Sequence, residues 1–176
     1  MFGQNEAYTF TKVGSRMECD GDLCFRRHIF HFKSRKNQIY LVYLDEFDAY
    51  NLCIVKFFLK AHRLSEKKFQ LLTGNGEAAS LITTCIAIMW KFYKANPYRS
   101  FGFIGMNSEG EATDMTKRFK LYSKVMSRKF NPLEFKHLVY PRKSAYLMLN
   151  VHALETNSRL LDDIEAFFDK HYEDLF

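Results

Sequence analysis

The sequence predicts an α+β protein, in which helices cover a mixed, mostly antiparallel sheet. Three observations support this class. The first seventy residues are rich in β-forming side chains, the apolar spacing changes to a helical period at Glu77, and strands and helices alternate from there on. The 176 residues, 47% of them hydrophobic, are enough for one domain with a sizeable core.

Strand candidates dominate the amino-terminal part of the chain. Residues 7–13 alternate in polarity, and glycines and polar residues at 14–21 favour a turn after them. Runs rich in β-branched and aromatic residues follow, with a hairpin turn expected at 34–37. They occupy residues 23–33, 38–44, 52–59 and, more briefly, 68–72. A meander of about five antiparallel strands is the simplest arrangement.

Helices and strands alternate in the rest of the chain. Residues 77–95 are apolar almost all round, which is typical of a largely buried helix. A second helix is expected at 112–130 and an amphipathic one at 158–175, each bounded by polar or proline-containing turns. Strands are expected at 99–106, 135–140 and 145–151, and Gly102 and Gly105 in the first of them predict close backbone approach. We expect one α+β domain over residues 1–154, with the acidic helical segment 155–176 packed on it or on a partner.

Charge is unevenly distributed along the chain, whose formal net charge is +6. Residues 155–176 hold seven acidic and two basic residues, so the first 154 residues hold 24 basic and 13 acidic ones, a net +11. The second expected helix carries a basic stripe opposite its apolar face, made of Lys117, Lys120, Lys124 and Arg128. This stripe predicts contact with nucleic acid or an acidic protein. A solvated basic surface balanced by the acidic helix is the alternative, and that helix also fits a homodimer.

The cellular compartment and the metal content are inferred from the amino-terminal residues, the longest apolar stretch and the spacing of cysteines and histidines. The first residues lack a secretory pattern, and the most apolar stretch is shorter than the ~20 residues of a membrane span. We therefore expect a cytoplasmic protein without a membrane partner, with four reduced cysteines. Cys19, Cys24, His28 and His31 are suitable zinc ligands by type, but their spacing is wrong for a zinc finger, so no metal is expected.

A glycine-containing turn precedes the long buried helix. Backbone amides there are suited to hold a pyrophosphate, because a helix amino terminus carries free N–H groups at positive potential. The residues concerned are Gly74, Asn75, Gly76, Ala78 and Ala79. The alternative is a turn whose Asn75 or Gly76 merely caps the helix.

The turn–helix–strand–helix–strand order over roughly residues 50–150 resembles the carboxy-terminal half of the GNAT acyl-CoA N-acyltransferases. Gly76 and Ala78 match the small positions of that family's coenzyme A loop, whereas Thr73 replaces its first Arg or Gln and Glu77 adds a negative charge. The resemblance implies that the chain binds an acyl-CoA and transfers the acyl group to an amine. It also implies that Tyr122, of the pair Leu121–Tyr122, protonates the departing thiolate. A core tyrosine and an inactive relative are the alternatives.

Overall fold

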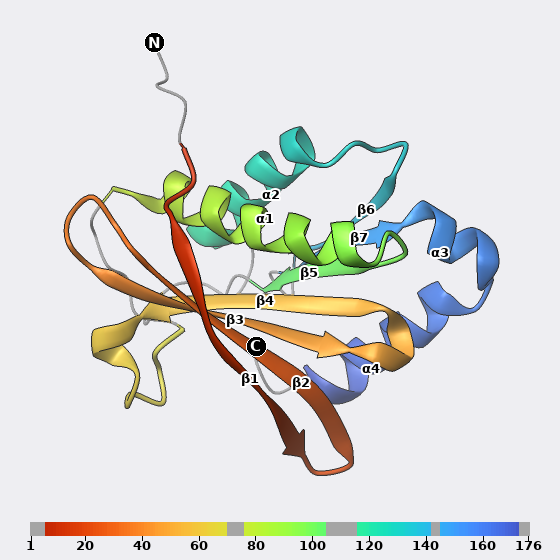
Figure 1. The fold of residues 1–176 in the computed structure, drawn as a ribbon. Coiled ribbons are helices and arrows are strands. Elements are labelled where there is room, and N and C mark those ends of the chain that lie inside the picture. Colours follow the sequence, from red (N-terminus) through yellow and green to blue (C-terminus); the bar gives the residue numbers. More distant parts are fainter. Residues whose placement is uncertain (1–5, 70–75, 105–115, 142–144, 173–176) are drawn as a thin grey trace.

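A computed structural model describes residues 6–69, 76–104, 116–141 and 145–172 of the chain. Within these residues the strands form one seven-stranded sheet in the order β1-β2-β3-β4-β5-β7-β6. The sheet is mixed and mostly antiparallel, and helices lie against it (Figure 1). The α+β class predicted from the sequence is therefore confirmed.

The first four strands form an antiparallel meander. They are β1 (Phe10–Asp20), β2 (Leu23–Lys33), β3 (Ile39–Phe47) and β4 (Leu52–Leu59). β4 then pairs in parallel with β5 (Ser100–Ile104), which is antiparallel to β7 (Ala145–Asn150). β7 lies between β5 and the other edge strand, β6 (Phe135–Tyr140).

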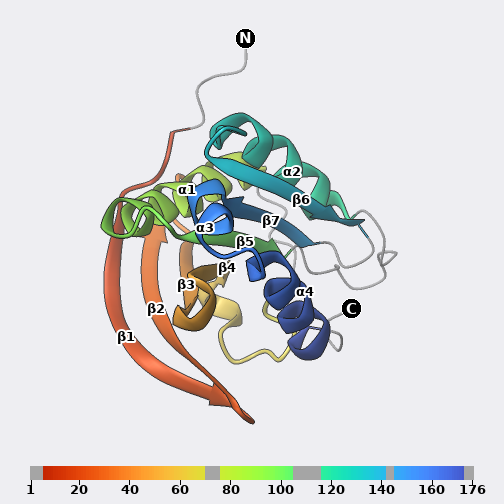
Figure 2. The same ribbon diagram turned by 90° about the vertical axis from the view of Figure 1, so that its right-hand side faces the viewer.

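Helices cover both faces of the sheet (Figure 2). One face carries α1 (Ala78–Ala95) and α2 (Lys117–Lys129), and the other carries α3 (Val151–Thr156) and α4 (Leu160–His171). Short 3-10 turns at Asp48–Tyr50 and Lys60–His62 follow β3 and β4. None of the helices in the described part of the chain has the length and apolarity that a bilayer span requires.

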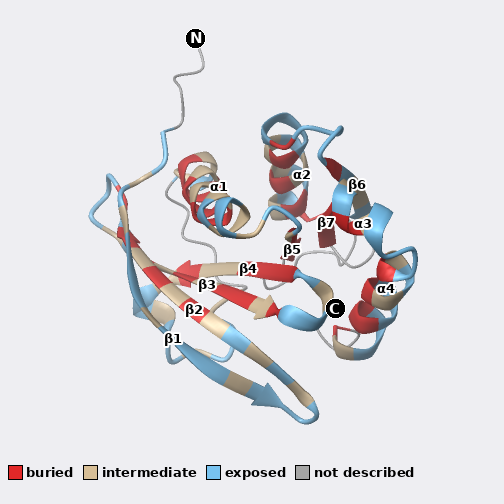
Figure 3. Ribbon diagram, turned by 45° about the vertical axis from the view of Figure 1, so that its right-hand side comes forward, coloured by how far each residue is buried: buried red, intermediate tan, exposed pale blue. Residues whose placement is uncertain are grey.

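Two apolar clusters separated by the sheet form the core. Because side chains alternate along a strand, Cys53 and Val55 of β4 join the cluster under α1 and α2, while Ile54 joins the cluster under α4. Figure 3 shows burial concentrated in β4, β5 and β7 and the inner sides of the helices, with β1 largely exposed. Packing of α4 on this chain's own sheet uses Leu160, Ile164, Phe167 and Phe168.

Several elements begin or end elsewhere than expected. β1 runs straight through residues 14–20, where a turn was predicted, and Gly21, with φ +57°, supplies the turn instead. α3 was not predicted; its amino terminus is capped by Asn150, whose side chain accepts a hydrogen bond from Ala153 N–H. The expected boundary at residue 154 falls inside this helix. Residues 68–69 of the short strand candidate form a turn, and its remainder lies outside the described residues.

Gly102 is closely surrounded, but by side chains of neighbouring elements and not by the backbone approach that the sequence predicts. A Cβ atom there would lie 2.6 Å from Ile54 Cδ1 and 2.9 Å from Leu147 Cδ2, with Phe168 of α4 at 3.8 Å. The missing side chain therefore lets both neighbouring strands and α4 pack over β5. Gly105 lies outside the described residues.

Candidate functional site

β4 and β5 are paired along only part of β4. The parallel register joins Leu52–Val55 with Ser100–Phe103, and β4 continues for four residues, to Leu59, beyond its last partner in β5. The β4–α1–β5 connection brings α1 back antiparallel to both strands, so its amino terminus lies at their carboxyl ends. The strand ends and the first turn of α1 therefore form one end of the molecule.

A pocket lies where the pairing of β4 and β5 ends. Its volume is about 50 Å³, room for a few water molecules. Strand residues, α2 and the segment after β4 all contribute to it, and the lining residues are Val55, Lys56, Phe57, Phe69, Phe103, Ile104, Arg118 and Tyr122. Aromatic rings and two cations thus share a small space, which suits a compact apolar group bearing an anionic or polar end.

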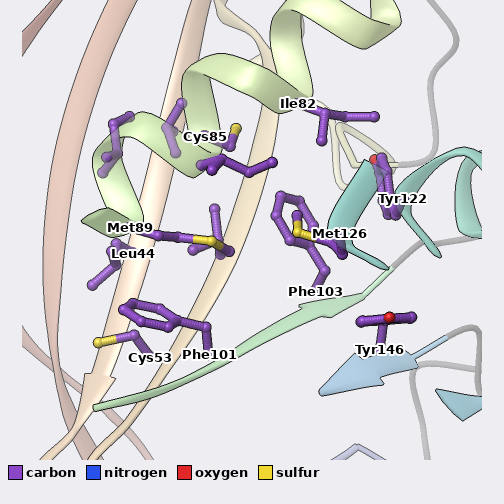
Figure 4. Close-up of a cluster of buried hydrophobic side chains, with 14 of the residues drawn as sticks. Leu44, Cys53, Ile82, Cys85, Met89, Phe101, Phe103, Tyr122, Met126 and Tyr146 are labelled. Carbon is purple, nitrogen blue, oxygen red and sulfur yellow. The ribbon is translucent and has the colours of Figure 1, made fainter. Parts of the chain in front are cut away.

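Tyr122 is both a core residue and a pocket residue. Its side chain is 5% exposed, and its ring lies 4.8 Å from that of Phe103 and 6.2 Å from that of Phe57. Figure 4 shows Tyr122 projecting from α2 beside Ile82 of α1 and Phe103 of β5. Burial raises the pKa of the Tyr122 hydroxyl, which therefore keeps its proton at neutral pH.

Two cations at the pocket are held by other parts of the chain. Arg118 of α2 donates a hydrogen bond to the backbone carbonyl of Phe69, in the segment after β4. The ammonium of Lys56 lies 3.2 Å from a carboxylate oxygen of Asp45, which is fully buried. Burial lowers the pKa of Lys56, and Asp45 opposes this shift. The pocket therefore has fixed positive charge on two sides.

The expected pyrophosphate turn is described only in part. Gly74 and Asn75 lie outside the described residues, whereas Gly76 is exposed with φ +69°, and Ala78 and Ala79 open α1 as small residues. A φ in this range favours glycine, so the backbone conformation alone explains a glycine at position 76.

Glu77 does not cap the helix that it precedes. Its carboxylate accepts a hydrogen bond of 2.8 Å from the Tyr8 hydroxyl and makes no capping bond to α1. Burial raises the pKa of Glu77, but the bonds from Tyr8 and Ser34 and the charge of Lys36 outweigh it and hold the pKa below its ordinary value. The negative charge is thus directed toward the β2–β3 turn and away from the first amides of α1.

The basic stripe predicted on the second helix forms one exposed face of α2. Its members Lys117, Lys120, Lys124 and Arg128 are all exposed, while Phe119, Tyr122 and Met126 are buried on the opposite face. The pocket and the stripe therefore lie on opposite sides of one helix. Arg118 lines the pocket, and Lys120 belongs to the exposed stripe.

Of the four cysteines expected to be reduced, two form a disulfide and two are free. Cys19 and Cys24 face one another across the β1–β2 pair and form a disulfide, because the two-residue turn between the strands makes them cross-strand neighbours. That expectation was wrong for this pair, while Cys53 and Cys85 are free and buried. No group of three or more potential metal ligands was found among the described residues.

Lys56, Phe69 and Arg118 were not predicted as site residues. The one sequence signal for Lys56 is a charge inside the apolar run LCIVKFFL, and no local pattern relates Phe69 to Arg118. The fold and site thus define an α+β protein with a small pocket between parting parallel strands. No family model, curated protein or solved structure matches the chain.

Proposed function

We propose that the chain binds an acyl-CoA at the opening between β4 and β5 and transfers the acyl group to an amine. The observation that carries this proposal is the position of Tyr122, in a pocket where two parallel strands part at the amino-terminal end of α1. The GNAT resemblance inferred from the sequence supports the same assignment, since it gives this tyrosine the role of proton donor.

Each part of the site has a distinct task in this proposal. Small residues at Gly76, Ala78 and Ala79 stand beside the first amides of α1, where the diphosphate is proposed to bind. Gly74 and Asn75 belong to the same proposed site by sequence alone. The pocket, of about 50 Å³, favours a short acyl chain such as acetyl. Arg118 lies beside Tyr122 and places positive charge where negative charge develops on the thioester oxygen or sulfur.

The chemistry asked of Tyr122 is that of a general acid. A bound acyl-CoA supplies an activated thioester, which an amine attacks to form the amide. The Tyr122 hydroxyl gives a proton to the departing sulfur and recovers one from the nitrogen. In this scheme the amine enters as the free base.

Acetyl-CoA binding tests the proposal through the melting temperature of the protein. At one hundred times Kd, a ligand adds about 2.7 kcal/mol, roughly 5–10 °C in Tm for a chain of this length. Arg118→Ala removes a pocket cation and is expected to reduce the shift. Lys120→Ala removes the same charge from the exposed face of the same helix and is expected to leave the shift intact. No shift at millimolar acetyl-CoA would refute the proposal.

The alternative function is a non-enzymatic module that binds nucleic acid or an acidic protein. The observation in its favour is the uninterrupted exposed row Lys117, Lys120, Lys124 and Arg128 on α2. The same two variants distinguish it, because polyanion binding depends on Lys120 and not on Arg118. Binding at this row also weakens steeply with salt.

Cytoplasmic location and homodimer formation belong to the same proposal. The Cys19–Cys24 disulfide argues against the cytoplasmic location, because such bonds persist mainly in oxidising compartments. In the single chain, α4 buries its apolar face on its own sheet, which leaves the edge strands of the described sheet, β1 and β6, as surfaces for a second copy.

A further inference from the structure

A chain of three polar side chains crosses the amino-terminal half of the sheet, away from the pocket. Ser15 Oγ on β1 lies 2.9 Å from His28 Nδ1 on β2. His28 Nε2 lies 2.6 Å from Glu46 Oε2 on β3. Serine, imidazole and carboxylate are thus connected in series by two hydrogen bonds, the arrangement that activates a serine hydroxyl in hydrolytic enzymes.

A β-bulge in β1 creates this alignment. Phe10 is opposite Phe32, and a regular ladder would place residue 14 opposite His28. The register shift between Lys12 and Gly14 inserts one residue, so Ser15 takes that place instead. Because a one-residue slip exchanges the two faces of a strand, the bulge turns Ser15 toward the His28 face.

Hydrogen bonding fixes the proton positions in the series. Burial raises the pKa of Glu46, but hydrogen bonds from His28 and Arg99 and the charge of Arg99 outweigh it and hold the pKa below its ordinary value. The ionised carboxylate only accepts, so Nε2 of His28 donates to it, and in the neutral imidazole Nδ1 is then the acceptor for the Ser15 hydroxyl. This is the tautomer that a general base acting on Ser15 requires.

The surrounding residues hold the imidazole and leave the hydroxyl accessible. His28 is 7% exposed, and its ring packs edge-on against Phe92 of α1 at 4.8 Å. Arg99 pairs with the other oxygen of Glu46 and lies over the same Phe92 ring. Ser15 itself is exposed on edge strand β1. A rigid base beside an accessible hydroxyl is the expected geometry of a nucleophile.

We propose that Ser15 is a nucleophile activated by His28 and Glu46, which takes up acyl groups from small activated esters. The Ser15 oxygen attacks the ester carbonyl while its proton passes to His28 Nδ1, and Glu46 stabilises the resulting imidazolium. The departing alkoxide takes that proton and leaves as the alcohol. Water, deprotonated by the same His28, then releases the carboxylic acid and restores Ser15.

A fluorophosphonate probe tests this proposal on the full chain with its disulfide intact. The expected product is one adduct per chain, assigned to Ser15 by peptide mass spectrometry. Ser15→Ala is expected to abolish the adduct. His28→Gln is expected to slow labelling about 100-fold or more, the usual contribution of a general base. Glu46→Gln, which keeps the shape of the side chain, is expected to slow it less.

Ser127→Ala is the matched control. Ser127 is an exposed serine on α2 whose hydroxyl donates to its own helix, at 3.2 Å from the Lys124 carbonyl, and its removal is expected to leave labelling unchanged. The proposal is overturned if no adduct forms, if the adduct lies on another residue, or if Ser15 reacts as fast in the His28 and Glu46 variants as in the parent protein. Should His28→Gln fail to fold, Glu46→Gln decides the matter.

Discussion

Asp45 illustrates how a single residue supports a charged site inside a β-sheet. It is fully buried, and both of its oxygens are occupied. Arg27 donates to them at 2.7 and 2.9 Å, and the Lys56 ammonium lies at 3.2 Å. Because Lys56 also lines the pocket, Asp45 fixes one of the two positive charges there. The arrangement stabilises the fold only while all three charges are present.

Replacing Asp45 by Asn is therefore expected to destabilise the protein strongly. The substitution removes the buried carboxylate that two half-buried cations share, and among the described residues only Arg27 keeps another carboxylate nearby, Glu18 at 3.8 Å, so the cost is expected to reach about 3 kcal/mol. Urea denaturation of Asp45→Asn against the parent measures the loss. Asp48→Asn, on an exposed residue of the turn after β3, is expected to stay within about 0.5 kcal/mol. A loss below about 1 kcal/mol for Asp45→Asn would show that water or rearrangement replaces the carboxylate.

At the scale of elements, the β1–β2 hairpin combines an exposed edge strand with a covalent link. Most β1 side chains are exposed, so little apolar burial holds its far end to β2. The Cys19–Cys24 disulfide closes the end of the hairpin four residues from Ser15. It thereby compensates for the missing contacts and helps to maintain the Ser15–His28 pair.

Removing the disulfide is expected to loosen this hairpin end locally. The double variant Cys19→Ser, Cys24→Ser loses at most about 2 kcal/mol, the loop-closure value for so short a loop. Hydrogen exchange is expected to rise near residues 16–27 and to stay low at Phe30 and Phe32, which are buried under α1. Reduction of the parent protein is expected to reproduce this pattern. Two free thiols at 19 and 24 in the parent, or an unchanged exchange pattern, would contradict the expectation.

Elements with strong local signals were predictable from the sequence. β2 and β4 match their predicted bounds, because runs of β-branched and aromatic residues are bounded there by turn residues. The predicted first strand ends too early because Gly14 and Ser15 favour a turn locally. In the structure, pairing with β2 and a bulge keep β1 extended through these residues. α3 was missed because Val151 continues an apolar strand pattern, and the Asn150 cap outweighs it.

The candidate site was predictable only where one segment carried the signal. Tyr122 was chosen because the pair Leu121–Tyr122 resembles a GNAT motif, and the small residues around Gly76 were chosen from the glycine-containing turn. Arg118 was not predicted, because its value depends on Phe69, far away in the sequence. Ser15, His28 and Glu46 were not connected either, since their alignment requires the register of three strands and the bulge in β1.

At the scale of the whole molecule, the order of the strands determines where the site lies. The parallel pair β4–β5 brings the carboxyl ends of two strands and the start of α1 to one end of the molecule, and α2 closes the pocket with Tyr122. α4 covers the opposite face and seals the second core cluster. The proposed function requires a thioester to bind in the opening between β4 and β5.

A crystal structure of the full chain grown with acetyl-CoA measures that position directly. We expect the thioester carbon in the pocket lined by Phe57, Phe103 and Tyr122, with the Tyr122 hydroxyl within hydrogen-bonding distance of the sulfur. We also expect the diphosphate at the first turn of α1, near Gly76 and Ala78. Acetyl-CoA bound along the exposed lysines of α2, with the pocket between β4 and β5 still empty, would contradict the proposed function.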